Sequence, residues 1–339
     1  MPKSGKPRSG SLQYWPRKRT SRIYANIKAY PKTDEIKPLD FACWKAGMTH
    51  VQILDNSNAP TKGQVIQKPV TILDCPSMFV CGARLYKMTA NGFTVIGDLW
   101  SPSLPKSLSS FLPSAKKSSG VSDASHVSHD ASASSHSSDF SHATDVRLIV
   151  CTQPTKAGIH KKKPEMFEVG IGGSDIKQRI DYAKSMIGKE LHAKDVFQAG
   201  EDVDVVAVTK GHGYTGPVKR FGIKLQGRKD KQHHRHAGSK GQERPGKQRW
   251  QVPMPGQYGF FRRTEFNKRI IMIDDDSKKI NVSGGFLRYG VVPGNFIMVE
   301  GSVPGPAKRL IRLRKAVRSL AKPRPVDIKY ISVESKQSA

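Results

Sequence analysis

Residues 210–250 combine side chains that bind phosphate groups with a backbone that is rich in glycine. The stretch contains twelve Lys or Arg, two acidic residues and eight Gly, and it has few large aliphatic side chains. Guanidinium and ammonium groups bind phosphates, aromatic rings stack on bases, and glycine lets the backbone approach a partner closely. This combination predicts that the stretch contacts a nucleic acid.

A glycine motif near the start of this stretch, Gly211-x-Gly213-x-x-Gly216, matches the fingerprint of dinucleotide-binding sites. Such a site needs a helix directly after the glycines, because the helix N-terminus holds the pyrophosphate. Pro217 follows instead, without a helical period, and the region where an acid is expected is rich in His, Arg and Lys. The glycines lie beside Lys210, Lys219 and Arg220, which favours close approach to RNA over a nucleotide cofactor.

Two clusters resemble metal or catalytic sites at first sight. His233, His234 and His236 have the right donor atoms for a metal, but the surrounding cations repel one, so contact with phosphates or bases is favoured. Asp274–Asp276 lies between two predicted strands beside Ser277 and two lysines, which is typical of a solvated turn. We find no Ser, His and Asp combination typical of nucleophilic catalysis, and no metal or other cofactor is expected.

The positive charge of the chain is concentrated in three segments. The 339 residues carry a net charge of +29, and residues 1–33, 210–250 and 301–326 account for +27 of it. The rest is nearly neutral, with enough apolar residues for a sizeable core. Segments 1–33 and 210–250 lack the composition of a core, so we expect them to become ordered against a polyanion. The alternative is that each is a disordered solubility tail.

Other classes of protein fit the sequence poorly. No run of about 18 apolar residues predicts a membrane-spanning helix, and the basic N-terminus lacks the apolar region of a secretory signal. Cys43, Cys75, Cys81 and Cys151 form no C-x-x-C pair, so we expect reduced, buried thiols in a cytoplasmic protein, with a Cys75–Cys81 disulfide as the alternative.

The remaining sequence predicts many short strands and one clear helix. A strand, a turn and a second strand are expected within 41–56, and further strands are expected at 65–74, 79–87, 93–100, 146–152, 203–209, 270–273, 280–282, 286–292, 296–301 and 310–313. The helix is expected at 175–187 with Ser174 as its N-cap and Gly188 at its end. Residues 101–145 are a Ser- and His-rich low-complexity insertion, expected to be mobile. The fold class is therefore mainly β, a β-barrel with an α+β insertion.

Several sequence blocks resemble the universal large-subunit ribosomal protein L-three family. They are WKAGMTHV (44–51), VTKGHGYTGPVKRFG (208–222), PGQYGFFRRTEFNKR (255–269), GGFLRYG (284–290) and VEGSVPGPAKRLIRLRKAVR (299–318). Two more blocks, GSLQYWPRKR (10–19) and KKKPEMFEVGIGG (161–173), are similar to the archaeal and eukaryotic branch, and the short C-terminus favours an archaeal source.

The resemblance implies a closed β-barrel of the translation-protein type, with a basic N-terminal extension and an internal finger loop. In this family the two extensions run through the large-subunit rRNA toward the peptidyl transferase centre, and the protein binds rRNA early in assembly. The family's neighbours include the large-subunit proteins L-fourteen and L-twenty-four-e. The finger tip here reads GSKGQERPGK (238–247), which is similar to the bacterial pattern and places Gln242 at the tip instead of a tryptophan.

These arguments give a domain plan and a set of RNA-binding residues. The plan is a basic extension at 1–40, barrel parts at 41–100 and 255–318, the low-complexity insertion at 101–145, the α+β insertion at 146–202, a strand and glycine loop at 203–222, the finger loop at 223–254, and a tail at 319–339. The RNA-binding set is Arg17, Lys18, Arg19, Lys161, Lys162, Lys163, Lys210, His212, Lys219, Arg220, Arg228, Lys229, Lys231, His233, His234, Arg235, His236, Lys240, Gln242, Arg244, Lys247, Arg249, Trp250, Arg262, Arg263, Lys308, Arg309, Arg312 and Arg314.

The favoured function is a non-catalytic structural constituent of the large ribosomal subunit that binds large-subunit rRNA. Two alternatives belong to other classes: an RNA-binding or chaperone-like module that acts outside ribosomes, and a nucleic-acid enzyme such as a nuclease or methyltransferase. The enzyme would need a metal–carboxylate cluster or a cofactor loop, and the candidates for both are weak.

Overall fold

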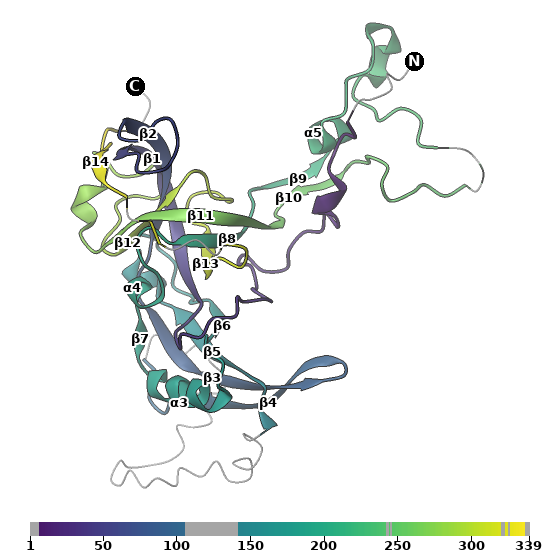
Figure 1. Ribbon diagram of the computed structural model, residues 1–339. Coiled ribbons are helices and arrows are strands. Elements are labelled where there is room, and N and C mark those ends of the chain that lie inside the picture. The colour runs from purple at the N-terminus through teal and green to yellow at the C-terminus, as the bar shows by residue number, and fades with distance from the viewer. Residues whose placement is uncertain are drawn as a thin grey trace, which may run out of the picture. The chain divides into compact units, whose positions relative to one another are not determined.

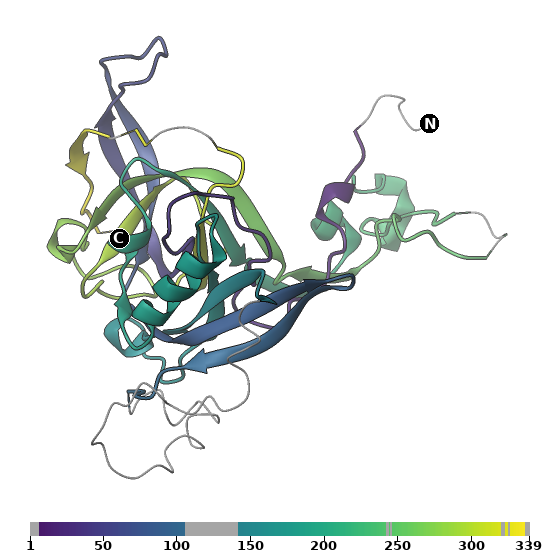
Figure 2. The same cartoon turned by 60° about the horizontal axis from the view of Figure 1, so that its bottom comes forward.

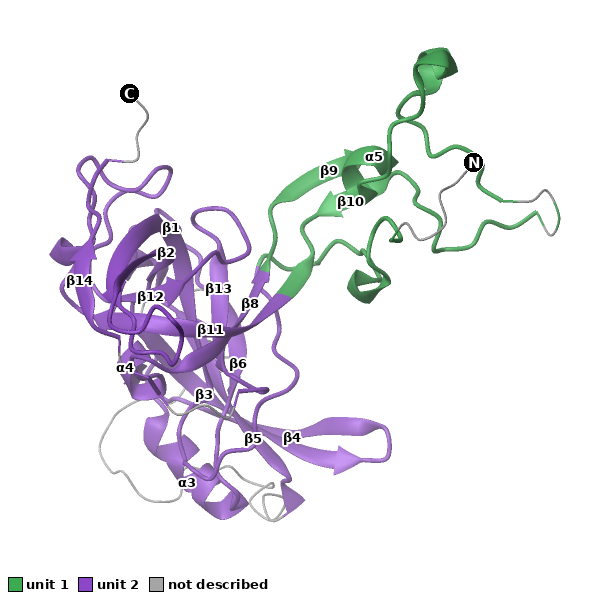
Figure 3. Ribbon diagram, turned by 45° about the horizontal axis from the view of Figure 1, so that its top comes forward, with its two compact units in different colours: residues 1–23, 208–263 green, residues 24–207, 264–339 purple. Residues whose placement is uncertain are grey.

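The computed structural model describes residues 7–105, 142–241, 244, 246–319, 323–324 and 326–335. Most of the low-complexity insertion, and Gln242 at the expected finger tip, lie outside these ranges. The chain divides into two compact units, which are coloured separately in Figure 3. Unit 1 comprises residues 1–23 and 208–263, and unit 2 comprises residues 24–207 and 264–339.

Unit 2 is mainly β and contains two sheets (Figure 1). The larger sheet has the order β13-β8-β11-β12-β2-β1-β14, and β1 also pairs with β13, so the hydrogen-bonded pairings return to their starting strand. Its strands are β1 (Asp40–Leu54), β2 (Val65–Asp74), β8 (Asp202–Val208), β11 (Arg262–Asp274), β12 (Phe296–Glu300), β13 (Leu310–Lys315) and β14 (Ile328–Ile331).

The second sheet of unit 2 has the order β4-β3-β5-β6, with β7 paired to β3. Its strands are β3 (Met78–Thr89), β4 (Gly92–Trp100), β5 (Asp145–Thr152), β6 (Met166–Gly170) and β7 (Glu190–Leu191). One hydrophobic cluster includes side chains from both sheets, among them Phe41, Leu73, Leu85 and Leu148. The two sheets therefore share one core, because each buries an apolar face against the other.

Short helices complete unit 2. They are α3 (Ile176–Met186), α4 (Ala193–Val196), η3 (Pro154–Lys156) and η5 (Ser277–Lys279). Helix α3 lies beside strands β3 and β5 (Figure 2) and packs Ile180 and Ala183 against the core. Its N-cap is Asp175, whose side chain accepts a hydrogen bond from Lys177 N, and the prediction of Ser174 is wrong. The described residues include no helix that is long and apolar enough to cross a membrane.

The turn expected within 41–56 is wrong, because β1 is one continuous strand of 15 residues. The pairing of β1 with β2 contains a bulge between Lys45 and Gly47. A Cβ at Gly47 would lie 2.6 Å from Cδ1 of Phe286, so this glycine provides room for a core ring and does not form a turn.

The strands expected at 280–282 and 286–292 are also wrong. Ile280, Val282 and Val292 are buried, but the backbone of this segment bonds locally, as from Gly290 N to Phe286 O. Its one bridge joins Phe286 and Gly290. Apolar periodicity there reflects burial of a loop, since the same pattern arises wherever side chains point inward.

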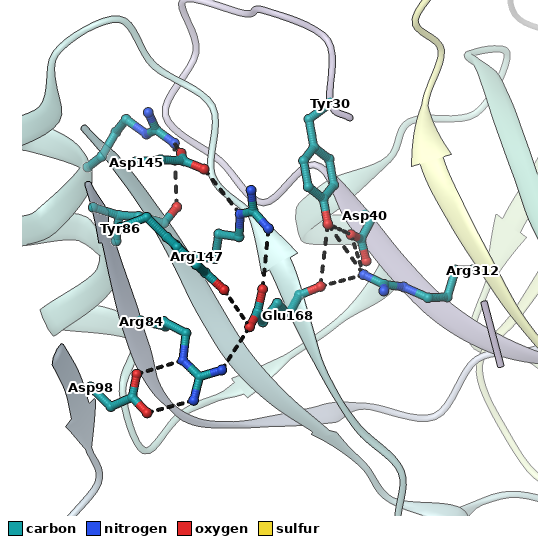
Figure 4. Close-up of polar contacts among 11 residues, drawn as sticks. Tyr30, Asp40, Arg84, Tyr86, Asp98, Asp145, Arg147, Glu168 and Arg312 are labelled. Atoms are coloured by element: carbon teal, nitrogen blue, oxygen red, sulfur yellow. Dashed lines mark hydrogen bonds and ion pairs between the residues drawn. The ribbon is translucent and has the colours of Figure 1, made fainter. Parts of the chain in front are cut away.

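A half-buried polar network crosses the second sheet (Figure 4). Arg84 binds Asp98 with two nitrogens, each at 2.7 Å, and its third nitrogen lies 3.0 Å from Glu168 Oε1. Arg147 contacts the other oxygen of Glu168 at 3.3 Å, and Tyr86 donates a hydrogen bond to Glu168 at 2.7 Å. The network ties β3, β4, β5 and β6 together, because each charged group has an opposite partner.

The four cysteines are free and buried, as expected, and no Cys75–Cys81 disulfide is formed. Cys81 instead lies beside Cys151, with 2.9 Å between their Sγ atoms. The Asp274–Asp276 segment is a turn, since Asp274 Oδ1 accepts hydrogen bonds from the backbone N–H groups of Asp275 and Asp276. The prediction of a solvated turn is thereby confirmed.

Candidate nucleic-acid interface

Unit 1 contains most of the predicted RNA-binding residues. Its elements are η1 (Leu12–Tyr14), β9 (Gly211–Thr215), α5 (Pro217–Phe221), η4 (Arg228–His233) and β10 (Gly256–Gly259). Strands β9 and β10 form an antiparallel two-stranded ribbon. Helix α5 does follow the glycine motif, which corrects the expectation of no helix, but it has only five residues.

A bulge in this ribbon brings two aromatic rings together. The register shifts between Tyr258 and Gly259, and the rings of His212 and Tyr258 stack with their centroids 5.1 Å apart. Gly259 has φ of +71°, and a Cβ there would lie 2.0 Å from Lys210 O. Only glycine fits this position, so the bulge and the ring pair depend on it.

The N-terminal segment is held in unit 1 by an aromatic and cationic cluster. Trp15 stacks on Phe221 at 5.9 Å and meets Trp250 edge-on at 5.0 Å. The guanidinium of Arg17 lies over the Phe221 ring at 4.6 Å, and that of Arg220 lies at 4.9 Å from the same ring. Each cation–aromatic contact contributes about 0.5–2 kcal/mol, so residues far apart in sequence are fixed in one site.

Several arginines of unit 1 are desolvated next to one another. Burial lowers the pKa of Arg17, Arg220 and Arg263, and repulsion from Arg17 lowers it further for the other two. Arg220 also donates hydrogen bonds to the carbonyls of Met254 and Gln257, so this predicted RNA contact also stabilises the unit.

Carboxylates are almost absent from unit 1. Its described residues contain nineteen Lys or Arg and one acid, Asp230. Side chains held close together without counter-charges make a surface that attracts anions. Among the described residues, no three His, Cys, Asp or Glu side chains group around a common metal position, and His233 and His236 instead lie ring to ring at 4.8 Å.

Most of the predicted set is accessible to a partner. Arg17, Lys161, Arg220, His234 and Arg263 are half-buried, and Lys161 forms an ion pair with Glu165. The exposed members are Lys18, Arg19, Lys162, Lys163, Lys210, His212, Lys219, Arg228, Lys229, Lys231, His233, Arg235, His236, Lys240, Arg244, Lys247, Arg249, Trp250, Arg262 and Lys308.

Three members of the set are buried in unit 2. Arg312 is 1% exposed and Arg314 is 8% exposed, and each binds a buried carboxylate at 2.6 Å, Asp40 and Asp204 respectively. Arg309 is 7% exposed. Arg312 and Arg314 are therefore excluded from the candidate surface, because their charges are already neutralised inside the fold. The sequence did not indicate that these arginines are buried. Alternating cations are typical of a strand with one exposed face, whereas both faces of β13 are covered.

The aromatic residues of the N-terminal segment also divide in a way that the sequence did not indicate. Tyr14 and Trp15 belong to unit 1, whereas Tyr24 is 7% exposed and Tyr30 donates a hydrogen bond to Asp40 in unit 2. Tyr258 was missed as a candidate, although it lies between glycines in the basic block 255–269.

Comparison with known proteins identifies close relatives along the whole chain. A sequence model of the family described as ribosomal protein L3 matches residues 1–338. A Methanopyrus kandleri protein named large ribosomal subunit protein uL3 is 44% identical over 98% of this chain and 92% of its own length. Proteins of the same name from Methanothermobacter thermautotrophicus and Nanoarchaeum equitans are 41% and 43% identical over 99% of this chain, and over 99% and 100% of their own lengths.

Proposed function

Because the chain belongs to the ribosomal protein L3 family, of archaeal type, we propose that it is a non-catalytic structural constituent of the large ribosomal subunit in the cytoplasm and that unit 1 binds large-subunit rRNA. The observation that carries the rRNA proposal is the charge of unit 1, with nineteen Lys or Arg against one acid among its described residues. RNA neutralises such a surface and releases counterions.

The test is the salt dependence of binding between the full chain and its large-subunit rRNA. Each neutralised phosphate contributes about 0.7–0.9 to the slope of log K against log salt. If roughly half of the unit 1 cations meet phosphates, the slope is steeper than about −6. A shallow slope near about −2 contradicts the proposal, because it corresponds to only a few phosphate contacts.

A matched pair of variants locates the contact. Lys219, Arg235 and Lys247 are exposed in unit 1. Replacing all three with Gln should make the slope of log K against log salt shallower by about 2 to 3. The control replaces three exposed lysines of unit 2, namely Lys87, Lys184 and Lys278, and removes the same charge. An equal effect of both triple variants contradicts an interface in unit 1, since it reflects net charge alone.

Three finer proposals follow from the family. We propose that the ring of strand pairings in unit 2 is the closed barrel, that the protein nucleates assembly, and that the loop 223–254 reaches toward the peptidyl transferase centre with Gln242 at its tip. The proposed neighbours are the L-fourteen and L-twenty-four-e proteins.

The variant Gln242→Ala should leave assembly of the large subunit near normal but change the sensitivity of ribosomes to peptidyl-transferase inhibitors. Loss of subunit assembly in that variant contradicts the tip assignment.

A further inference from the structure

Unit 1 contains a pocket whose walls combine stacked rings with guanidinium groups. Its volume is about 340 Å³, at the lower end of the roughly 300–1,000 Å³ typical of small-molecule sites. His212, Tyr258 and Tyr14 contribute rings to the lining. Its positive charges come from Arg17, Arg263 and Lys210. An RNA duplex does not fit such a volume, whereas one base that has left its stack does.

The rings of the pocket are held in place before any ligand arrives. His212 and Tyr258 lie nearly parallel, with 24° between their planes, and the ribbon bulge at Gly259 fixes them. The guanidinium of Arg263 covers the Tyr14 ring at 5.0 Å and lies at the same distance from Phe261. A base that stacks here meets an ordered surface, so little entropy is lost on binding.

The charges of the pocket select an anion. Arg17 and Arg263 are half-buried and repel each other, and the lining contains no carboxylate. A phosphate between them relieves this repulsion and accepts charge-assisted hydrogen bonds. Rings for a base and two guanidiniums for a phosphate in one small pocket match a nucleotide, which carries both groups, better than the Asp and Glu side chains of an acidic peptide, which have no flat ring to stack.

We propose that this pocket holds a single unpaired nucleotide of the rRNA, with its base on the His212–Tyr258 rings and its phosphate against Arg17 and Arg263. The inference rests on the proposed rRNA binding and adds a site for one extruded base. The surrounding cations then hold the backbone on either side of that nucleotide.

The test compares Tyr258→Leu with Tyr214→Leu in the full chain bound to its large-subunit rRNA. Tyr214 is a matched control because it lies on β9, is 79% exposed and does not line the pocket. Stacking of one base on an aromatic side chain contributes enough that its loss should raise Kd by about 5- to 140-fold. The salt slope should stay unchanged, since no cation is removed, and Tyr258→Phe should restore the affinity.

Chemical probing of the RNA 2′-hydroxyls provides the second readout. One nucleotide should become reactive in the complex with Tyr258→Leu and remain protected with Tyr258→Phe and Tyr214→Leu. Equal affinities for Tyr258→Leu and Tyr214→Leu, or changes spread over a helix, overturn the pocket while a steep salt slope upholds rRNA binding. A shallow slope of the unmodified protein instead overturns the proposed function itself. Tighter binding of poly-glutamate than of rRNA also overturns the pocket, because it identifies an acidic protein segment as the occupant.

Discussion

Replacing Arg312 with Met should destabilise unit 2 without removing an RNA contact. The Arg312 guanidinium binds Asp40 at 2.6 Å and the carbonyl of Glu168 at 2.5 Å (Figure 4). It also lies 4.3 Å from the centre of the Phe167 ring. Arg312 lies on β13, Asp40 on β1, and Phe167 on β6 of the other sheet. The substitution therefore weakens the contacts that β13 makes with β1 and with β6.

The size of the effect follows from burial. The side chains of Arg312 and Asp40 are 2% and 0% exposed, so water cannot replace the lost partner. Removing one member of such a pair leaves the other as an uncompensated charge and costs about 3–5 kcal/mol in the free energy of unfolding. Tyr30 still donates its 2.6 Å hydrogen bond to Asp40, which places the expected value toward the lower end of that range.

The measurement is urea unfolding followed by far-ultraviolet circular dichroism, together with Kd for rRNA under folded conditions. The control is Lys308→Met, which removes an exposed cation of the same basic segment and should leave the unfolding free energy within about 0.5 kcal/mol. The double variant Arg312→Met with Asp40→Asn should recover part of the loss, because the buried charge is gone. If Arg312→Met unfolds like the unmodified protein but binds rRNA more weakly, the interior role assigned to this arginine is refuted.

Acid should weaken unit 2 partly through Glu190. The hydrogen bond from Lys156 is the main cause that lowers the pKa of Glu190 to about 2. The contribution of the ionised Glu190 to the free energy of unfolding is therefore fully present above about pH 4.3 and is lost as the pH falls toward 2. Glu190→Gln should flatten the dependence of the unfolding free energy on pH in that window. The effect should be no more than about 1 kcal/mol, because the side chains of Lys156 and Glu190 are both partly exposed. An unchanged pH profile contradicts the role given to Glu190. Gly82→Ala should lower the unfolding free energy by about 1–3 kcal/mol, since its Cβ would lie 2.2 Å from the Leu99 carbonyl oxygen. The control Gly294→Ala has open space around it, and equal melting temperatures for the two variants would disprove the steric argument.

Charge and composition alone were enough to indicate the candidate interface. Residues 1–33 and 210–250 are too basic and too poor in aliphatic side chains to build a core by themselves, and cations without counter-charges need an anionic partner. Strands such as β2 (Val65–Asp74) were predicted with their bounds, because an apolar run between turn residues depends only on local sequence.

The tertiary structure decided which cations face a partner and which belong to the core. In the sequence, Lys308, Arg309, Arg312 and Arg314 are equivalent cations of one basic segment. The three arginines are nevertheless buried and Lys308 is exposed, because burial depends on strands that pair from distant parts of the chain. The same holds for Gly47, which reads as a turn but makes room for Phe286, a residue more than two hundred positions away in sequence. His212 and Tyr258 meet only because a bulge shifts the register of β9 and β10, and no local pattern encodes that contact. The local sequence shows which side chains are apolar and how they are spaced. Contacts with distant parts of the chain decide whether a charged side chain is buried and whether a glycine forms a turn or makes room for another residue.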